Sequence, residues 1–286
     1  MNAAEDRVRA LAADVLGVEG RAIRSVERIE QGLTNENWIA RTTQKAVVVR
    51  FNSPNAEALG VDRYSEERVL QIAAQAGVGP RVLRCDPEAH LLITELLPGT
   101  PWSVEYARST AGIARLAALM RDVHAISIAD GIKRVDALTV VEHYWATLNR
   151  AGQVSLAGPA EQRAAAQVIG KELREELRPR LCHNDVHHLN LMDDGSVRLL
   201  DWEYAGVGDP YFDLAGICCY HGYDADQCEQ LLQHYLGRED DKASARLDSA
   251  RWIFNYIRDL WTAVNALPAG ITSSAQSASP PPLRRP

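Results

Sequence analysis

The segment from His183 to Asn190 has the residue types and spacing of a phosphoryl-transfer site. It reads His-Asn-Asp-Val-His-His-Leu-Asn, with Asp185 five positions before Asn190 and sixteen before Asp201. One carboxylate can orient a substrate hydroxyl and accept its proton, while an amide and a second carboxylate hold the magnesium ions that neutralise a triphosphate. Magnesium prefers such hard oxygen ligands. The pattern therefore predicts a catalytic Asp185 and the metal ligands Asn190 and Asp201.

A zinc site is an alternative for the same segment, because it holds three histidines and follows Cys182. His183 and His187 have the i, i+4 spacing that a helix presents on one face. However, a His-Asn-Asp run disfavours a helix interior, and a zinc site needs a convincing remaining ligand set. A zinc hydrolase, which would use His188 as well, and a polar loop without function stay open as alternatives. The apolar strand and Asp201 downstream favour phosphoryl transfer.

The composition is that of a globular protein with a full core. Hydrophobic residues make up 46% of the 286 residues and charged residues 24%. A net charge of −7 argues against nucleic acid as the main partner, since a phosphate-binding surface needs a basic stripe. No apolar run approaches the length of a membrane span, and the N-terminus lacks a signal-peptide core, so we expect no membrane contact and a cytoplasmic location.

The elements that must position these residues fall into two groups. We expect a helix over the first seventeen residues, strands at 23–29, from 38 and at 46–51, a helix at 62–76, and strands at 81–85 and 90–95. Leu97-Pro98-Gly99 then indicates a hinge. Beyond it, helical patterns cover 103–125, 136–151, 160–178, 211–221, 224–237 and 241–266, and Asp194-Gly195 forms the turn of a hairpin.

These patterns predict an α+β chain with two lobes. Residues 1–97 form a small antiparallel β-sheet lobe with one main helix, and residues 98–270 form a larger helical lobe. Residues 271–286, which are rich in Ser, Ala and Pro, form a disordered tail. A small mostly-β lobe, a hinge, and a helical lobe with HxDxxxxN and a following Asp together resemble the protein-kinase-like fold.

Details of the second lobe resemble the small-molecule branch of that fold. The block after Asp201 reads Asp-Trp-Glu-Tyr-Ala-Gly, followed by Gly-Asp-Pro and Phe-Asp-Leu-Ala. It looks like the choline/ethanolamine kinases and the bacterial thiamine kinases, with aminoglycoside phosphotransferases as more distant relatives. The resemblance covers residues 25–265. It implies a two-lobed kinase that uses ATP and Mg²⁺, with a nucleotide-binding first lobe and a catalytic, acceptor-binding second lobe.

The resemblance also implies which residues contact the nucleotide. The turn Gly32-Leu33-Thr34-Asn35 looks like the phosphate-covering turn of choline kinases, so Gly32, Thr34 and Asn35 would meet phosphate oxygens. Arg50 stands where protein kinases place a lysine, and it can pair with phosphate and with a helix glutamate. Glu66 is our choice for that partner, with Glu67 and Glu57 as alternatives. The segment 92–97, including Glu95 and Leu97, would offer backbone groups to the adenine.

The acceptor implied by the resemblance is a small, hydroxylated and cationic molecule such as choline, ethanolamine or thiamine. A quaternary ammonium needs aromatic faces. The candidates are Trp252, Tyr256 and Trp261 in the last helix and Tyr204, Tyr211 and Tyr220 after Asp201. We assign Tyr204 and Trp261 to the acceptor, with Glu203 either attracting a cation or pairing locally. An aminoglycoside or sugar phosphotransferase is the alternative, and a nucleotide-binding pseudokinase is a further one.

Three more polar residues are expected to support the site without touching substrate. His124 stands near the end of a long helical pattern, and we expect it to be buried and hydrogen-bonded. Asp209 and Asp213 follow the metal-ligand block and are expected to cap and orient the loop-to-helix transition there. Asp213 is also expected to support the predicted catalytic segment, residues 183–190.

Overall fold

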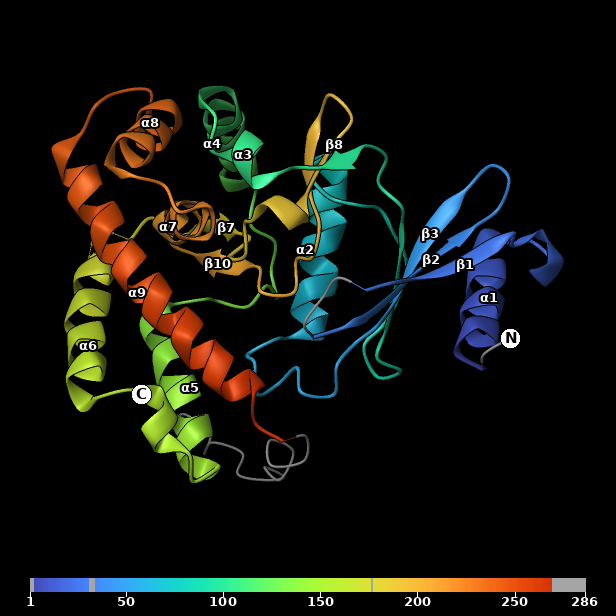
Figure 1. Cartoon of the computed structure of the whole chain (residues 1–286), viewed down its shortest axis with the longest axis horizontal. Helices are drawn as coiled ribbons and strands as arrows, with labels where there is room; N and C mark the ends of the chain where they lie inside the picture. Colours follow the sequence, from blue (N-terminus) through green and yellow to red (C-terminus); the bar gives the residue numbers. More distant parts are fainter. Residues whose placement is uncertain (1–2, 31–33, 176, 269–286) are drawn as a thin grey trace, which may run out of the picture.

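The computed structural model describes residues 3–30, 34–175 and 177–268, and it has a sheet at one end and helices at the other (Figure 1). In the described part, the sheet has the order β1-β2-β3-β5-β4 and every neighbouring pair is antiparallel. Its strands are β1 (Ser25–Ile29), β2 (Glu36–Arg41), β3 (Ala46–Phe51), β4 (Val82–Asp86) and β5 (Leu91–Glu95). The predicted α+β, two-lobed fold class is confirmed.

Alternation along the strands gives the sheet two different faces. Val47 and Val49 of β3 are buried against helix α1 (Ala3–Leu16), together with Ile93 of β5. Val48 and Arg50, the intervening residues of β3, lie on the opposite face and line a cavity. Successive side chains of a strand point to opposite faces, so this register is what turns Arg50 toward the site.

Helix α2 (Arg63–Gln75) connects the sheet to the helical half. Asp62 caps its N-terminus by accepting hydrogen bonds from two backbone amides. Its apolar residues Val69, Leu70 and Ala73 belong to the same buried cluster as the helices of the second half. Glu66 and Arg63 lie one turn earlier and are also buried. The core therefore continues from one half to the other through this helix.

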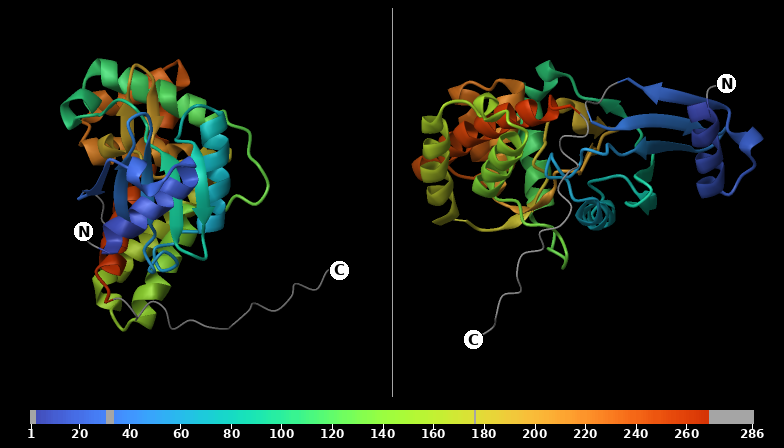
Figure 2. Two further views of the ribbon diagram at one scale, coloured as in Figure 1. Left: turned by 90° about the vertical axis from the view of Figure 1, so that its right-hand side faces the viewer. Right: turned by 90° about the horizontal axis from the view of Figure 1, so that it is seen from below.

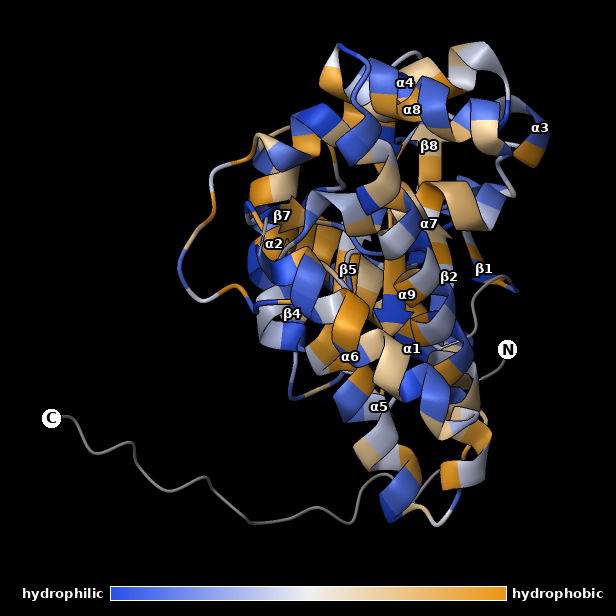
Figure 3. Cartoon of the chain, turned by 90° about the vertical axis from the view of Figure 1, so that its left-hand side faces the viewer, coloured by the Kyte–Doolittle hydropathy of each residue, from blue (hydrophilic) through white to orange (hydrophobic). Residues whose placement is uncertain are grey.

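The helical half is built around the long helix α9 (Asp241–Asn265), which packs against α5 (Ala137–Arg150), α6 (Ala160–Glu175) and α7 (Pro210–His221). Helix α4 (Thr110–His124) packs against α8 (Ala225–Leu236). Figure 2 shows the sheet and these helices at opposite ends of the molecule, and Figure 3 shows apolar and polar residues alternating along the helices. Leu116, Ile217 and Leu231 are fully buried there.

Short elements complete the second half. They are the 3₁₀ helices Val154–Ala157 and His188–Asn190, and the strands β6 (Thr100–Pro101), β7 (Arg180–Cys182), β8 (Leu191–Asp193), β9 (Val197–Leu199) and β10 (Gly206–Gly208). A further 3₁₀ helix, Gly20–Ala22, lies in the first half between α1 and β1. Strands β8 and β9 form the hairpin predicted around Asp194-Gly195. Among the helices that the structure describes, none has the length and apolarity to cross a membrane. The predicted tail, 271–286, lies outside the described residues.

The helix predicted over 103–125 is wrong in one respect, because the structure divides it. Helix α3 spans Val104–Ala107, and α4 begins at Thr110. Ser103 and Ser109 each cap one helix with the side-chain oxygen, which satisfies the first backbone amides of each. Gly112 makes the sharp junction possible, because a Cβ atom there would lie 2.0 Å from the carbonyl oxygen of Tyr106.

Candidate active site

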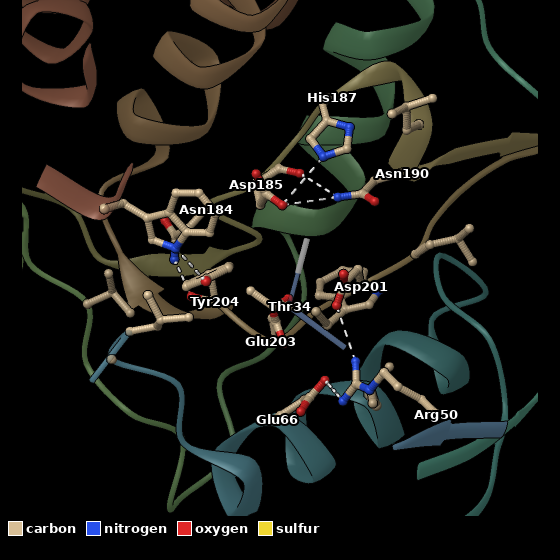
Figure 4. Close-up of a pocket in the computed structure, with 18 of the residues that line it drawn as sticks. Thr34, Arg50, Glu66, Asn184, Asp185, His187, Asn190, Asp201, Glu203 and Tyr204 are labelled. Atoms are coloured by element: carbon tan, nitrogen blue, oxygen red, sulfur yellow. Dashed lines mark hydrogen bonds and ion pairs between the residues drawn. The ribbon is translucent and has the colours of Figure 1, made fainter. Parts of the chain in front are cut away.

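A cavity of about 910 Å³ lies between the sheet and the helical half. Its wall takes side chains from β3, α2, the hinge after β5, the catalytic segment and α9. Figure 4 shows Asp185, His187 and Asn190 on one side of it and Arg50 with Glu66 on the other. All the predicted site residues that the structure describes, apart from Asn35, line this cavity, whereas Gly32 lies outside the described residues.

Asp185 is held by three side chains. The hydroxyl of Tyr220 donates to its Oδ1 at 2.7 Å, the amide of Asn190 donates to Oδ2 at 3.2 Å, and Nε2 of His187 lies 3.6 Å from Oδ2. Burial by itself would raise the pKa of Asp185, but the contacts with His187 and Tyr220 outweigh burial and hold that pKa below its usual value. The carboxylate is therefore charged and oriented before any substrate arrives.

Hydrogen bonds to the Asp213 carboxylate hold the backbone at the start of the catalytic segment. This carboxylate accepts hydrogen bonds from the amides of His183 at 2.9 Å and Asn184 at 2.6 Å, and Nε2 of His124 lies 3.0 Å away. Asn184 has a φ of 66°, a left-handed conformation that asparagine tolerates better than most residues. The predictions that His124 is buried and hydrogen-bonded, and that Asp213 supports this segment, are confirmed. Asp209 caps α7, also as predicted.

The His183 side chain connects the catalytic segment to the residue before Asp201. Its Nε2 donates to the carbonyl oxygen of Leu200 at 2.8 Å, which ties the catalytic segment to the strand before Asp201. Burial lowers the pKa of His183, so the neutral ring with one donor nitrogen fits this position. In the described part of the chain, the one group of residues with metal-ligand spacing is His124, Cys182 and Asp213, which contains none of the three histidines considered for zinc.

Asp201 lies across the cavity from Asp185 and contacts Arg50. Its backbone has a φ of 56°, and its Oδ1 is 3.2 Å from a guanidinium nitrogen of Arg50. Enclosure by the protein is the main reason why the pKa of Asp201 lies well above its usual value, and repulsion from Glu203 raises it further. The attraction of Arg50 opposes this rise. Negative charge is therefore in excess at this point of the cavity.

Arg50 and Glu66 form the ion pair that the sequence predicted. Nη2 of Arg50 is 2.6 Å from Oε1 of Glu66, and both side chains are almost fully buried. Burial opposes the charge of each, but their mutual attraction raises the pKa of Arg50 and contributes to lowering that of Glu66. The second Glu66 oxygen accepts from Arg63 at 2.8 Å. Glu67 and Glu57 do not take part in this pair.

Arg63 extends this pairing to Glu203 in the other half. The same Nη1 atom lies 2.9 Å from Oε2 of Glu203, whose side chain is only 3% exposed. Thr34 and Asn35 also donate to Glu203, at 3.2 and 2.7 Å. Of the two roles predicted for Glu203, the structure shows the local pairing. The last two residues of the predicted phosphate-covering turn are thus hydrogen-bonded directly to the helical half.

The segment after β5 forms another wall. Glu95 and Leu97 both line the cavity, and Leu97 is buried. The Glu95 carboxylate accepts a hydrogen bond from the backbone amide of Arg81, so its side chain is directed to the sheet edge. Beyond this segment, Trp102 and Arg115 hold Asp193 of the β8–β9 hairpin. The Arg115 hydrogen bonds lower the pKa of Asp193 to about 2.

The aromatic residues proposed for the acceptor divide into two sets. Tyr204, Tyr220 and Trp261 line the cavity, and the indole of Trp261 donates to the Tyr204 hydroxyl at 2.8 Å. The remaining candidates, Trp252, Tyr256 and Tyr211, do not line it. Tyr256 instead donates to the carbonyl oxygen of Ala157. Asn184 donates to the backbone oxygen of Tyr204 at 2.9 Å, which links this wall to the catalytic segment (Figure 4).

Two contacts of the site were not predicted from the sequence. No role was predicted for Arg63, and its partner Glu203 is 140 residues away. Tyr220 was considered for substrate contact, whereas its hydroxyl donates to the carboxylate of Asp185. The sequence signal for Tyr220 is its place near the end of α7, the helix that Asp209 begins. No local pattern points to the Arg63–Glu203 pair.

Comparisons with known proteins agree with this geometry. The phosphotransferase enzyme family matches residues 25–247. The chain is 33% identical over 102 residues to Protein LicA of Haemophilus influenzae, covering 33% of this chain and 38% of that protein. It is 25% identical over 243 residues to ethanolamine kinase 2 of Rattus norvegicus, covering 77% and 62%. The matched segments thus span less than two thirds of each of these relatives.

A solved structure shows the same fold over nearly the whole chain. The structure of choline kinase LicA from Streptococcus pneumoniae superposes with a TM-score of 0.78 at 22% identity, covering 92% of this chain and 91% of that one. The architecture is therefore the kinase-like fold expected from the sequence. Because the family match extends over most of the chain and includes Arg50, Asp185, Asn190 and Asp201, the chain belongs to the phosphotransferase enzyme family.

Proposed function

We propose that this protein is an ATP-dependent kinase that phosphorylates the hydroxyl of a small amine-bearing alcohol, the class that includes choline, ethanolamine and thiamine. The observation that carries the proposal is the convergence of Asp185, Asn190 and Asp201 on one cavity, opposite the Arg50–Glu66 pair. In this account, residues 1–97 bind the nucleotide and residues 98–270 supply the catalytic and acceptor-binding groups. The names of the relatives support the acceptor class.

Asp185 is suited to act on the acceptor hydroxyl. Its low pKa keeps it ionised, so it aligns the hydroxyl and accepts the proton as the oxygen attacks the γ-phosphorus. The new oxygen–phosphorus bond forms while the bond from the γ-phosphorus to the bridging oxygen breaks, which leaves ADP. Tyr220 and Asn190 fix the direction of the carboxylate during this step. Catalysis of this kind depends mainly on positioning and electrostatics.

The donor set of the cavity fits magnesium. Asn190 and Asp201 supply hard oxygen atoms, and Asp201 has excess negative charge around it. The carboxylates that meet here outnumber the arginines that neutralise them: Asp185, Asp201, Glu66 and Glu203 against Arg50 and Arg63. When bound, magnesium would neutralise phosphate charge. Arg50, which Glu66 holds in place, would supply a guanidinium to the same phosphates.

The proposed acceptor site is the aromatic wall formed by Tyr204, Tyr220 and Trp261. It adjoins Asp185 through the Tyr220 hydroxyl, so an acceptor bound there has its hydroxyl near the catalytic carboxylate. Aromatic faces attract an ammonium group without needing hydrogen bonds from it. Glu203 adds negative charge nearby, although Arg63 already neutralises much of it.

A panel of acceptors with ATP and magnesium tests the proposal. Choline, ethanolamine, thiamine, aminoglycosides, amino sugars and hydroxyamino acids are incubated separately, and mass spectrometry detects the phosphorylated product. We expect at least one amine-bearing alcohol to gain a phosphoryl group. Phosphorylation confined to aminoglycosides or sugars would favour the alternative acceptor class. ATP binding without a product from any acceptor would contradict the proposal and favour a pseudokinase.

A further inference from the structure

Arg258 stands out on the acceptor side of the cavity because its charge is not neutralised within the described chain. It lines the cavity from α9, and its guanidinium forms no ion pair or side-chain hydrogen bond with the residues that the structure describes. Arg134 also lines the cavity without an ion pair or side-chain hydrogen bond to the described residues, but it lies outside α9, whereas Arg258 lies on α9 one turn from Trp261. The other two, Arg50 and Lys133, have partners. Arg50 pairs with Glu66 and Asp201, and the Lys133 ammonium donates to two backbone oxygens.

The position of Arg258 places it beside the proposed acceptor. Trp261 and Thr262 follow it by three and four residues, so they share its face of α9, and both line the cavity. Its charge acts on Tyr220: burial raises the pKa of the Tyr220 phenol, and Arg258 opposes that rise. The Tyr220 hydroxyl is 2.7 Å from Asp185. Arg258 therefore lies within the field of the group that holds the catalytic carboxylate.

Two carboxylates of the cavity wall already pair with arginines of the protein. Glu203 pairs with Arg63, and Asp136 pairs with Arg174 through two nitrogens. In the proposed function, Asp185 acts on the hydroxyl and Asp201 holds magnesium, so a purely cationic acceptor would have the Arg258 guanidinium beside it without a carboxylate of its own to offset that repulsion. A guanidinium fork instead matches a carboxylate, with two parallel hydrogen bonds. The aromatic faces of Tyr204 and Trp261 stay available to an ammonium group on the same molecule.

We propose that Arg258 binds a carboxylate of the acceptor, so that the preferred acceptor is a zwitterion with a hydroxyl, an amine and a carboxylate. This inference rests on the proposed function and narrows its substrate class. A hydroxyamino acid has these three groups on a short chain. Its hydroxyl would face Asp185, its ammonium the aromatic wall and its carboxylate Arg258. Arg258 is thus a specificity-determining residue of the transfer reaction.

Matched acceptors that differ only by the carboxylate test this inference. L-serine is compared with ethanolamine, and L-homoserine with 3-amino-1-propanol, by measuring kcat/KM for ATP-dependent phosphorylation. We expect the carboxylated member of at least one pair to have the higher kcat/KM by about 10- to 100-fold, the range expected for hydrogen bonds to a charged group. Arg258→Gln should remove most of that difference by lowering kcat/KM of the carboxylated acceptor. Arg258→Lys should restore only part of it.

A matched control and the contrary outcomes complete the test. Arg251 lies on the same helix, pairs with Asp248 and does not line the cavity, so Arg251→Gln should leave the preference unchanged. If the simple amines are phosphorylated equally well or better by the unaltered protein, the inference is wrong while the proposed function stands. If no acceptor of either kind is phosphorylated, the proposed function itself is contradicted and the inference fails with it. The comparison in the unaltered protein does not depend on the folding of any variant.

Discussion

Replacing Asp213 with asparagine should slow catalysis without altering any group that touches substrate. The Asp213 carboxylate accepts from two backbone amides of the catalytic segment and contacts Nε2 of His124. Asparagine has one acceptor oxygen, and its amide nitrogen would face a donor. At least one buried N–H group, that of His183 or Asn184, would then lose its partner. Such an orphaned group costs about 1–3 kcal/mol.

Two consequences follow from that loss. The stability of the protein should fall by about 2–3 kcal/mol once the lost charge assistance is included, which corresponds to a Tm lower by roughly 4–12 °C. The backbone before Asp185 should also move. A displacement of about 1 Å in a catalytic group can cost about 100-fold in rate, so we expect kcat to fall by that factor. KM for ATP should change little, because Arg50 and Glu66 lie in the other half.

Steady-state kinetics at a temperature well below both melting transitions, with calorimetry for Tm, measures both effects. Asp209→Asn is the matched control, since Asp209 begins the same helix and pairs with Arg246. Asparagine is an equally good N-cap residue, so this variant loses only the ion pair. It should lower Tm but leave kcat nearly unchanged. An Asp213→Asn protein with unaltered kcat would refute the idea that this carboxylate positions the catalytic segment.

Two further predictions concern the charged pairs. Glu66→Ala should destabilise the protein by about 3 kcal/mol in urea denaturation and weaken ATP binding, because buried Arg50 loses its closest partner and keeps only the longer contact with Asp201. Unchanged stability would show that this pair is not needed. The pKa of Asp193 is lowered to about 2 by Arg115, so its contribution to stability is fully present above the unfolded value of about 3.9 and is lost as pH falls toward 2. That contribution is about 1–2 kcal/mol, since the pair is partly exposed. The free energy of unfolding of Arg115→Gln should therefore lie below that of the unaltered protein at pH 5, and this difference should shrink as pH falls to 2. A difference that stays constant over this range would contradict this account.

Much of the site was predictable because its signals are local. Asp185 and Asn190 lie in one short segment, and alternation along β3 determines which face carries Arg50. Glu66 could be chosen because it lies in the first turn of the only helix predicted between two strands of the sheet, 46–51 and 81–85. Asp209 was recognisable as a cap, since Asp209-Pro210 immediately precedes the helical pattern predicted at 211–221, and proline is favoured at the first position of a helix. In each case the relevant neighbours are within one element or at its end.

The remaining features depend on packing between distant segments. Nothing near Glu203 in the sequence indicates that Arg63 will form an ion pair with it and that Asn35 will donate a hydrogen bond to it. Tyr256 and Trp261 were both proposed for the acceptor, but five residues turn an α-helix by about 140°, so they lie on different faces. Only Trp261 lines the cavity. Helical periodicity in the sequence shows which residues share a face of α9. The packing of neighbouring helices determines which of these aromatic residues are covered and which line the cavity.

The central claim is that Asp185 acts on the acceptor hydroxyl while the nucleotide is bound elsewhere in the cavity. The direct measurement is a comparison of Asp185→Asn with the unaltered protein, with phosphoryl transfer measured at saturating acceptor and ATP affinity measured by calorimetry. The account predicts that transfer falls by about 10²–10⁴-fold, the usual contribution of a positioned base, while ATP affinity persists. Transfer at the unaltered rate in the variant would contradict it.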